Sequence, residues 1–322
     1  MLLIKTETGP GKDFFRLKRA IQLGYLLKKK IDLIFSVSGG KIPEELLKAG
    51  KFPFPLVKTS DEIFSHNLSS VLFDKCRTDK EDISLIEFAK KNDIKIIKFA
   101  ESGEDQAGID LFIDPTAIEG LSASPGKNNL SGPEYTILHH KYIHFNKLKR
   151  KYGKQVKNIL FVPGEDQDYR YTRNITDILT RHNFNVKIVP GKNLKKSNLK
   201  TLRRIYPRVR FTGKIESLAR PFFETDLAIV QPDISACKAA AAGTPAIYLT
   251  TNKNMENKAD AFENNGAGEK YPEKNIDEKV LVNLIRSFTL ERRQAMGGSG
   301  KRLIDGRGIY RIVDLLTAEK LI

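Results

Sequence analysis

Two polar side chains near the start of one predicted helix could bind a charged ligand. Residues 226–249, DLAIVQPDISACKAAAAGTPAIYL, have the pattern of a strand, a short break, an Ala-rich helix and a second strand. A right-handed crossover places the start of such a helix at the carboxyl end of the first strand, where α/β folds bind ligands. Ser235 lies near the helix start and Lys238 lies one turn along it. The Lys238 ammonium could meet a phosphate, or it could spoil a sugar site that requires an acid.

A second candidate ligand loop follows the first predicted strand. Gly9-Pro10-Gly11 stands between that strand and a helix, and glycines there let the backbone approach an anion. The motif is shorter than a dinucleotide fingerprint, and a tight turn explains it equally well. The run Gly297–Lys301 resembles a phosphate-binding loop only superficially, because no strand precedes it and Arg302 replaces the required Ser or Thr.

Neither disulfide nor metal chemistry is indicated by the cysteines and histidines. The two cysteines, Cys76 and Cys237, lie far apart and have no metal-ligand spacing. His139, His140 and His144 lie close together without a carboxylate pair. We interpret them as surface or interface residues, because a metal site or a general base needs convergent partners. We expect no metal and no cofactor.

Positive charge is concentrated in the second half of the chain. The chain has 55 Lys and Arg and 39 Asp and Glu, a net charge of +16. Residues 1–150 contain 24 of these basic residues and 20 of the acidic ones, so they carry only +4. Lys187–Lys214 contains ten basic residues and no acid. Such a field attracts anionic lipid, nucleic acid or phosphorylated ligands, although a solvated lysine-rich face is an equally good interpretation. No nucleic-acid motif accompanies it, so anionic membrane is the candidate partner and nucleic acid is not expected.

The segments that would position these residues alternate between strand and helix patterns. Strands are predicted at 2–6, 31–38, 69–73, 94–99, 111–114, 158–162, 186–189, 227–230 and 246–249. Helices are predicted at 13–30, 43–49, 80–91, 171–182, 194–206, 255–264, 277–288, 290–297 and 308–316. This alternation is typical of parallel sheets covered by helices on both faces, and it predicts an α/β fold with two Rossmann-like halves.

The length of 322 residues is too great for one ordinary core. We expect an N-terminal domain at 1–146, a linker at 147–157 and a C-terminal domain at 158–304. A closing helix within 305–322 is expected to pack back toward the N-terminal domain. No segment reaches transmembrane length or resembles a signal peptide. The expected location is cytoplasmic, peripheral to the inner membrane face.

Three segments resemble one protein family and follow one another in its order. They are SGPEYTILHHKYIHF (Ser131–Phe145), MENKADAFENNG (Met255–Gly266) and LIDGRGIYRIVDLL (Leu303–Leu316). They are similar to the UDP-sugar hydrolases of pseudaminic acid synthesis and to spore-coat polysaccharide proteins, which are relatives of the MurG-type glycosyltransferases. The resemblance implies a GT-B-like fold with two Rossmann-like domains and an interdomain cleft. It also implies a nucleotide-sugar ligand, UDP- or CMP-linked.

The same resemblance implies which residues would bind that ligand. The nucleotide is expected on the C-terminal domain and the sugar is expected to face the N-terminal one. The positions expected to bind the nucleotide sugar are Gly9, Gly11, Lys12, Tyr135, Gly164, Asp166, Ser235, Lys238 and Asn257.

Four positions depart from the family pattern. Lys12 stands where a His general base is expected. Cys76 stands where a Tyr is expected, because Asp74-Lys75-Cys76 replaces an Asp-x-Tyr motif. Phe99-Ala100-Glu101 replaces a paired-aspartate turn, and Lys238 replaces a ribose-binding Glu. We therefore expect a nucleotide-sugar-binding protein of surface glycan biosynthesis (nonulosonic acid or polysaccharide) with altered or lost hydrolysis. The alternatives are a non-catalytic scaffold with this fold and a basic glycosyltransferase at the membrane surface.

Overall fold

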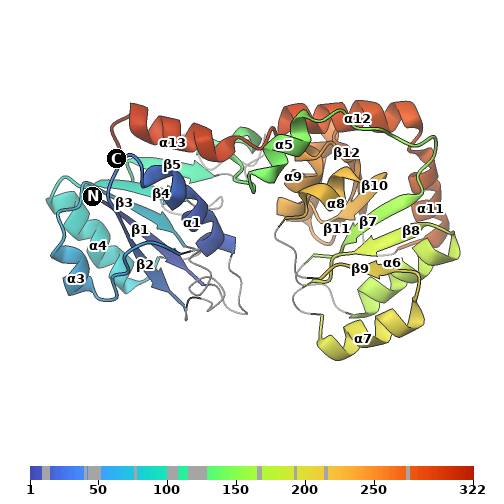
Figure 1. Ribbon diagram of the computed structural model, residues 1–322, viewed down its shortest axis with the longest axis horizontal. Coiled ribbons are helices and arrows are strands. Elements are labelled where there is room, and N and C mark those ends of the chain that lie inside the picture. Colours follow the sequence, from blue (N-terminus) through green and yellow to red (C-terminus); the bar gives the residue numbers. More distant parts are fainter. Residues whose placement is uncertain are drawn as a thin grey trace. The chain divides into compact units, whose positions relative to one another are not determined.

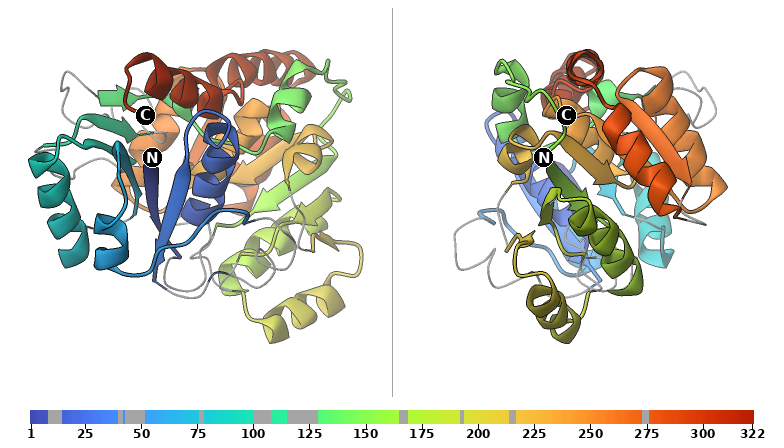
Figure 2. Two further views of the ribbon diagram at one scale, coloured as in Figure 1. Left: turned by 60° about the vertical axis from the view of Figure 1, so that its left-hand side comes forward. Right: turned by 90° about the vertical axis from the view of Figure 1, so that its right-hand side faces the viewer.

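The computed structural model describes residues 1–8, 15–39, 42, 52–75, 78–99, 108–114, 129–164, 169–191, 194–213, 217–272 and 276–322. These residues form two compact units, each built on one parallel sheet (Figure 1). The first unit holds the described residues from Met1 to Ile137 together with Gly308–Ile322, and the second holds those of Leu138–Arg307. Both chain termini therefore lie in the first unit (Figure 2).

The first unit contains a parallel sheet with strand order β2-β1-β3-β4-β5-β6. Its strands are short and largely buried, as expected when helices cover both faces of a parallel sheet. They are β1 (Leu2–Glu7), β2 (Leu33–Ser38), β3 (Ser70–Asp74), β4 (Lys95–Phe99), β5 (Leu111–Asp114) and β6 (Asn129–Ser131).

Successive residues of these strands pack against opposite helix layers, because side chains alternate along a strand. Leu2 and Ile4 pack in the layer of α1 and α13, whereas Leu3 packs in the layer of α3 and α4. The helices are α1 (Phe15–Leu27), α3 (Ser60–Phe64), α4 (Lys80–Lys91), the 3₁₀ turn η1 (Pro133–Tyr135) and α13 (Gly308–Ala318). The last helix of the chain is thus part of the first unit's core.

The second unit contains a parallel sheet with strand order β12-β11-β10-β7-β8-β9. The strands are β7 (Asn158–Val162), β8 (Asn185–Ile188), β9 (Arg210–Phe211), β10 (Leu227–Val230), β11 (Ala246–Thr250) and β12 (Gly268–Pro272). Leu160 and Ala228 pack toward α9, whereas Ile159 and Leu227 pack toward α6 and α11.

Eight helices of the described chain surround this second sheet. They are α5 (Lys141–Lys147), α6 (Tyr169–Arg181), α7 (Lys196–Ile205), α8 (Ala219–Phe223), α9 (Ile234–Ala241), α10 (Lys253–Asn264), α11 (Glu278–Ser287) and α12 (Leu290–Leu303). The strand–helix–strand unit expected at 226–249 is present as β10, α9 and β11.

Some elements differ from the prediction. Short elements such as β6, β9, β12 and α8 were not predicted, since two to five residues give too little periodicity. The helix predicted at 290–297 continues through the glycines to Leu303. A β-carbon at Gly300 would lie 3.0 Å from the Cα of Ala240, so this glycine lets α12 pack tightly against α9. The helix predicted at 43–49 lies outside the described residues.

The segment expected to be a linker belongs with the second unit in this structure. The Arg150 guanidinium donates to the Thr244 hydroxyl at 2.8 Å, and the Tyr152 hydroxyl donates to the carbonyl of Gly243 at 3.0 Å. The two units divide after Ile137 and after Arg307 in this structure, and the sequence suggested 146 and 304.

Candidate functional site

The strand order of the second sheet singles out one edge as the candidate ligand site. β7 pairs with β8 on one side and with β10 on the other. The strand order therefore reverses between β7 and β10, which are the first and fourth strands of this sheet along the chain. In open parallel sheets, ligands bind at the carboxyl ends of the two strands where the order reverses. We call the residues that follow these ends, Gly164 and Gln231–Asp233, the ligand edge.

Gly164 and Gln231 contact each other at the ligand edge. Gly164 has a φ of +92°, which L side chains rarely adopt. A β-carbon on Gly164 would lie 2.0 Å from Oε1 of Gln231. The carboxamide thus fills the space on that side of the backbone, and both the conformation and the neighbour require glycine.

Sequence reasoning did not identify Gln231. Its side chain is 5% exposed, and no hydrogen bond joins its carboxamide to another residue in the described part of the chain. A Gln-Pro pair after a strand indicates only a break in the strand. The position becomes informative once β10 is known to pair with β7, and no local pattern predicts that pairing.

The start of α9 carries its own negative charge. Asp233 is the N-cap residue, and its Oδ1 accepts a hydrogen bond from the Ser235 backbone N–H at 2.6 Å. An N-cap carboxylate satisfies the open N–H groups and the positive end of the helix dipole. A phosphate placed at this end would therefore meet a carboxylate already in position.

The predicted residues of α9 lie where the sequence pattern placed them. Ser235 is in the first turn and is buried, and Lys238 lies one turn along and is half-buried. Asn146 holds the other end of the helix, because its Nδ2 donates to the Ala241 carbonyl at 3.1 Å. Hydrogen bonds at both ends and close packing on α12 fix the position of α9.

The remaining predicted ligand residues are distributed over both units. Asn257 is exposed in the second turn of α10, which follows β11, the neighbour of β10. Tyr135 belongs to η1 in the first unit and packs against the core formed with α1 and α13. The other predicted positions lie outside the described residues: Gly9, Gly11, Lys12, Cys76 and Asp166.

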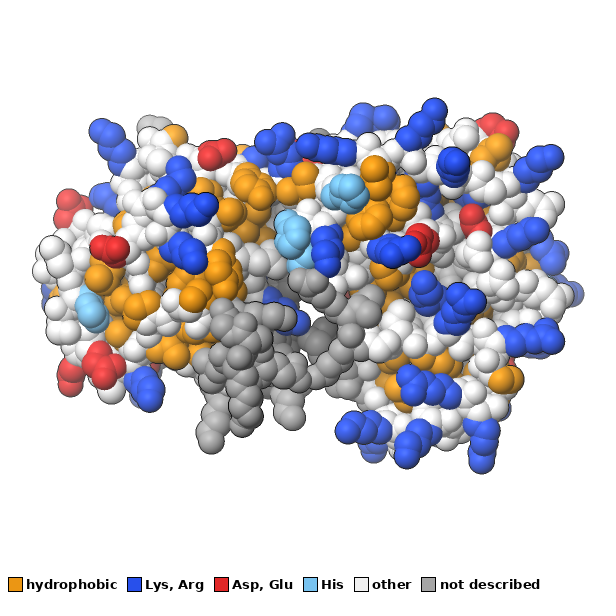
Figure 3. Space-filling view, in the orientation of Figure 1, with side chains coloured by type: hydrophobic (Ala, Val, Ile, Leu, Met, Phe, Trp, Pro, Cys, Tyr) orange, Lys and Arg blue, Asp and Glu red, His pale blue; other side chains and the backbone are white. Residues whose placement is uncertain are grey.

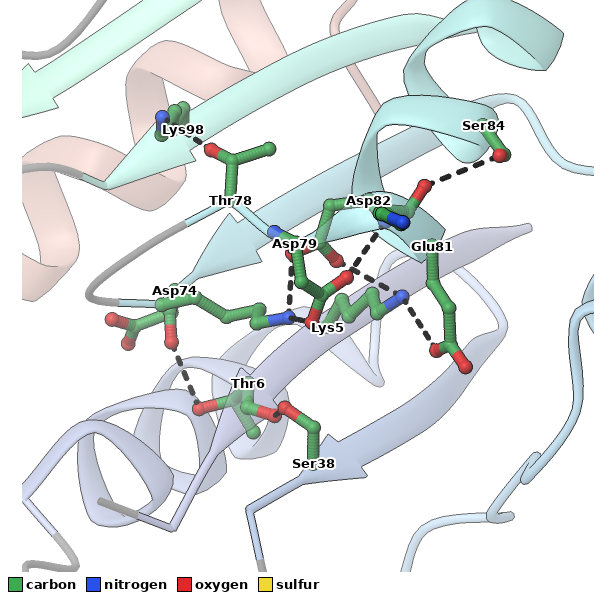
Figure 4. A network of polar contacts seen from close by, with 12 residues as sticks. Lys5, Thr6, Ser38, Asp74, Thr78, Asp79, Glu81, Asp82, Ser84 and Lys98 are labelled. Carbon is green, nitrogen blue, oxygen red and sulfur yellow. Dashed lines mark hydrogen bonds and ion pairs between the residues drawn. The ribbon is translucent and has the colours of Figure 1, made fainter. Parts of the chain in front are cut away.

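The first unit has an equivalent edge, because its strand order reverses between β1 and β3. Asp74 ends β3 and is fully buried. Its carboxylate accepts two hydrogen bonds from the Arg19 guanidinium, one of them from Nε at 2.9 Å. The Thr6 hydroxyl donates to the backbone carbonyl of Asp74 at 3.2 Å (Figure 4). Asp74 is thus paired within the fold.

Lys75 follows Asp74 and is bound by two carboxylates, those of Asp79 and Asp82, which Figure 4 labels near the start of α4. Its Nζ lies 2.5 Å from Oδ2 of Asp79 and 2.5 Å from Oδ2 of Asp82. Lys5 approaches the other oxygen of the Asp82 carboxylate at 2.9 Å. Asp79 and Asp82 also form the capping box of α4. This network ties the end of β3 to the start of α4.

Titration of this network follows from its contacts. Burial would lower the pKa of Lys75, but hydrogen bonds to Asp79 and Asp82 outweigh it and raise the pKa. Burial would raise the pKa of Asp79, but the Lys75 ammonium and the Asp82 backbone N–H lower it to about 2. Lys75 is therefore a protonated ammonium near neutral pH, and it is not a general base.

The histidines have no metal-site geometry in the described chain. The rings of His139 and His140 lie 4.2 Å apart, and the Lys141 N–H donates to Nδ1 of His139 at 3.3 Å. His140 and His144 are exposed. Among the described residues, no group of three His, Cys, Asp or Glu side chains could hold a metal ion.

A basic face covers α7 and the residues that follow it. Seven exposed side chains contribute: Lys195, Lys196, Lys200, Arg203, Arg204, Arg208 and Arg210. No acidic residue occurs between Leu194 and Gly213. Figure 3 shows Lys and Arg gathered over this part of the second unit. We call these seven side chains the α7 face; they lie within the basic stretch predicted from sequence.

In the part of the chain that the structure describes, no helix is both long enough and apolar enough to span a bilayer.

Solved structures with the same fold are numerous, although no protein-family model and no curated protein matches the chain. MurG from Acinetobacter baumannii matches with a TM-score of 0.68 at 12% identity, covering 98% of this chain and 99% of MurG. The kitacinnamycin glycotransferase matches with a TM-score of 0.69 at 11% identity, covering 100% and 98%. UDP-GlcNAc 2-epimerase from Neisseria meningitidis, bound to UDP-GlcNAc, matches with a TM-score of 0.64 at 12% identity, covering 99% and 100%.

These matches extend over nearly the whole of each chain and therefore compare both units. Together with the two parallel sheets and their helix layers, they show that this chain has the GT-B fold. The α/β fold with two Rossmann-like units predicted from sequence is confirmed. A fold hosts many functions, so the function has to be argued from the residues of the site.

Proposed function

We propose that this chain binds a nucleotide sugar at the ligand edge of the second unit and acts in surface glycan biosynthesis. The observation that supports this most is the reversal of strand order between β7 and β10, with Gly164, Gln231 and the start of α9 beside it. The Neisseria structure with this fold holds UDP-GlcNAc. By analogy, the ligand of this chain is a UDP- or CMP-linked sugar of nonulosonic acid or polysaccharide synthesis.

The proposed ligand is more anionic than an ordinary UDP-sugar. Lys238 stands where the resembled family has an acid, and Lys12 stands where it has a His. Two cations at such positions favour a nucleotide sugar with an added negative charge, for example a carboxylate on the sugar. Hydrolysis by the family mechanism is proposed to be altered or lost, since Asp74 and Lys75 are engaged in ion pairs and Lys12 is a poor base.

Isothermal titration calorimetry with the wild-type protein tests nucleotide binding directly. UDP, CMP, UDP-GlcNAc and a CMP-linked nonulosonic acid are titrated separately under identical buffer conditions. We expect saturable binding of at least one, with the acidic-sugar conjugate bound more tightly than its neutral counterpart. Absence of binding by all four at millimolar concentration would contradict the proposal and would favour a non-catalytic scaffold.

The Lys238→Glu variant tests the role assigned to the cation. We expect binding of the preferred ligand to weaken at least about tenfold, since a favourable contact of about 1.4 kcal/mol is lost. Lys253→Glu is the matched control, because Lys253 is an exposed lysine on α10 of the same unit. Tighter nucleotide binding by Lys238→Glu would contradict the proposed role and would indicate a site that has lost its acid.

A second proposal concerns location and rests on the α7 face. Seven exposed cations without an acid between them would attract an anionic bilayer surface, at about 1 kcal/mol for each residue near it. The chain is therefore proposed to act in the cytoplasm, peripheral to the inner membrane face. This location suits a glycosyltransferase of membrane-linked acceptors, which is the alternative to a hydrolase-like protein.

A further inference from the structure

Gln231 is a buried residue whose carboxamide makes no hydrogen bond to the described residues. Its residue is 5% exposed, and its oxygen and nitrogen lie over the Cα of Gly164. The carboxamide therefore has no protein partner that a ligand would have to displace, and replacing it with an apolar side chain of similar size removes no hydrogen bond within the protein. Such an arrangement at a ligand edge is typical of a group that obtains its partners from the ligand.

The surroundings hold this carboxamide in one place. Gly164 leaves room for it only because that position lacks a β-carbon, which would lie 2.4 Å from Cδ of Gln231. The Gln231 carbonyl also accepts the Asp233 N–H at 2.9 Å, which fixes the backbone of this turn. Gln231 is therefore positioned by the end of β7 and by the start of α9.

The chemistry of a matching ligand group follows from the charges nearby. Asp233 places a carboxylate at the start of α9, so it disfavours an anionic group beside Gln231, and Lys238 is the proposed contact for the anionic part of the ligand. A neutral carboxamide offers one acceptor and two donors. A second amide, with one N–H and one C=O side by side, satisfies both ends of it.

We propose that Gln231 is a specificity-determining residue that hydrogen-bonds a neutral amide of the ligand. This inference rests on the proposed nucleotide-sugar function and deepens it. Two parts of such a ligand carry an amide N–H and C=O. Uracil presents its N3–H and C4=O on one edge and can pair with both ends of the carboxamide, whereas a trans acetamido group on the sugar can pair with one end at a time. Neither the phosphates nor the sugar carboxylate are bound by Gln231.

Gln231→Met tests this because methionine has a similar volume and cannot form the hydrogen bonds. The wild type and the variant are titrated with UDP, UDP-glucose and UDP-GlcNAc, and their Tm values are measured without ligand. We expect at least about a tenfold weaker Kd and an unchanged or higher Tm. If the base supplies the amide, all three ligands weaken equally, whereas an acetamido contact weakens UDP-GlcNAc alone.

Asn146 provides the matched control for stability, because it is a carboxamide in the same unit with three hydrogen-bond acceptors. Its Nδ2 donates to the carbonyls of Ala241, Lys301 and Ile304, each at 3.1 Å. Asn146→Leu is therefore expected to lower the Tm. A comparable loss of Tm in Gln231→Met would show that Gln231 is structural and would overturn the inference.

Two results separate this inference from the function on which it rests. If the wild type binds these ligands and Gln231→Met binds them equally well, the role of Gln231 is wrong and the proposed function stands. If the wild type binds none of these three ligands and no CMP conjugate either, both the role of Gln231 and the proposed function are wrong. Gln231→Glu is a second variant that keeps the side-chain shape, and it is expected to weaken binding because it loses the donors.

Discussion

Gly164 is the residue on which the geometry of the ligand edge most directly depends. Its φ of +92° and the carboxamide beside it both exclude a β-carbon. An alanine there must either move Gln231 or shift the end of β7. Substitutions at Gly164 and at Gln231 are therefore not independent, and their effects on the free energy of unfolding are expected to be coupled.

Gly164→Ala is expected to destabilise the fold by about 1–3 kcal/mol, because a non-glycine residue is strained at this positive φ. The free energy of unfolding is measured by urea titration. Gly213→Ala is the control, since no heavy atom lies within 4 Å of its β-carbon position and its φ is not in the positive range. Equal stability of the two variants would contradict the account of Gly164.

The low pKa of Asp79 predicts a pH dependence of stability. The pKa is about 2 when folded and about 3.9 when unfolded. The unfolded state therefore binds a proton more readily, and the stabilisation is present above about pH 4 and lost as the pH falls through about 2. Asp79→Asn removes the charge but keeps an N-cap acceptor for α4.

We expect wild type to be more stable than Asp79→Asn at pH 7, and the difference to disappear near pH 2. Urea midpoints between pH 2 and pH 7 give this comparison. Asp314→Asn, on the exposed side of α13, is the control and should show no such trend. A difference that does not change with pH would show that Asp79 acts through its shape alone.

The roles of individual residues were only partly predictable. Ser235 and Lys238 were placed correctly on their helix, because the Ala-rich run after an apolar strand is a local pattern. The pairing of Lys75 with Asp82 was not predicted, since it depends on how α4 packs beside β3. Gln231 was missed for the same reason, because its importance arises from a strand pairing distant in sequence.

Among the helices, α9 and α12 form the closest packing that bears on the ligand edge. Gly297 lies where a β-carbon would be 2.6 Å from the Gly243 carbonyl oxygen, next to the end of α9. Gly298, its neighbour, would place a β-carbon 3.5 Å from the end of the flexible Arg302 side chain. The two glycines therefore differ in packing while sharing one helix.

Gly297→Ala and Gly298→Ala are expected to change stability in opposite directions. Alanine is favoured over glycine inside a helix by about 1 kcal/mol, and Gly298→Ala should gain most of it. Gly297→Ala should lose more than this gain, because the added methyl group meets backbone. Thermal unfolding of both variants decides the matter, and a stabilised Gly297→Ala would contradict the packing described.

The predictable elements are the ones with a strong local period. The buried strands of both sheets and most of the longer helices were predicted to within a few residues. The shortest elements were not, as for β9 with two residues. The end of α12 was placed too early, because glycines usually stop a helix, whereas here tertiary packing retains them.

For the molecule as a whole, the charge is uneven. The α7 face belongs to the second unit alone, and its cations are exposed. Electrostatic attraction to a bilayer falls off within a Debye length and weakens with salt. The location proposed for this protein therefore makes a specific prediction for lipid vesicles.

The full-length protein is expected to sediment with vesicles containing anionic phospholipid and not with purely zwitterionic vesicles, and to dissociate at high salt. Charge reversal at Lys195, Lys196 and Lys200 should abolish most of the binding. Reversal of three exposed lysines elsewhere, Lys18, Lys91 and Lys279, is the control of equal net charge. Equal loss in both variants would contradict a dedicated membrane face.

The central claim is that a nucleotide sugar binds at the ligand edge, where the strand order reverses. Amide hydrogen exchange of the full-length protein with and without UDP tests it directly. We predict slower exchange on binding in peptides covering Phe161–Gly164 and Gln231–Lys238, with no change at the opposite ends of β7 and β10. Protection limited to Lys157–Asn158 and Asp226, at those opposite ends, would contradict the account.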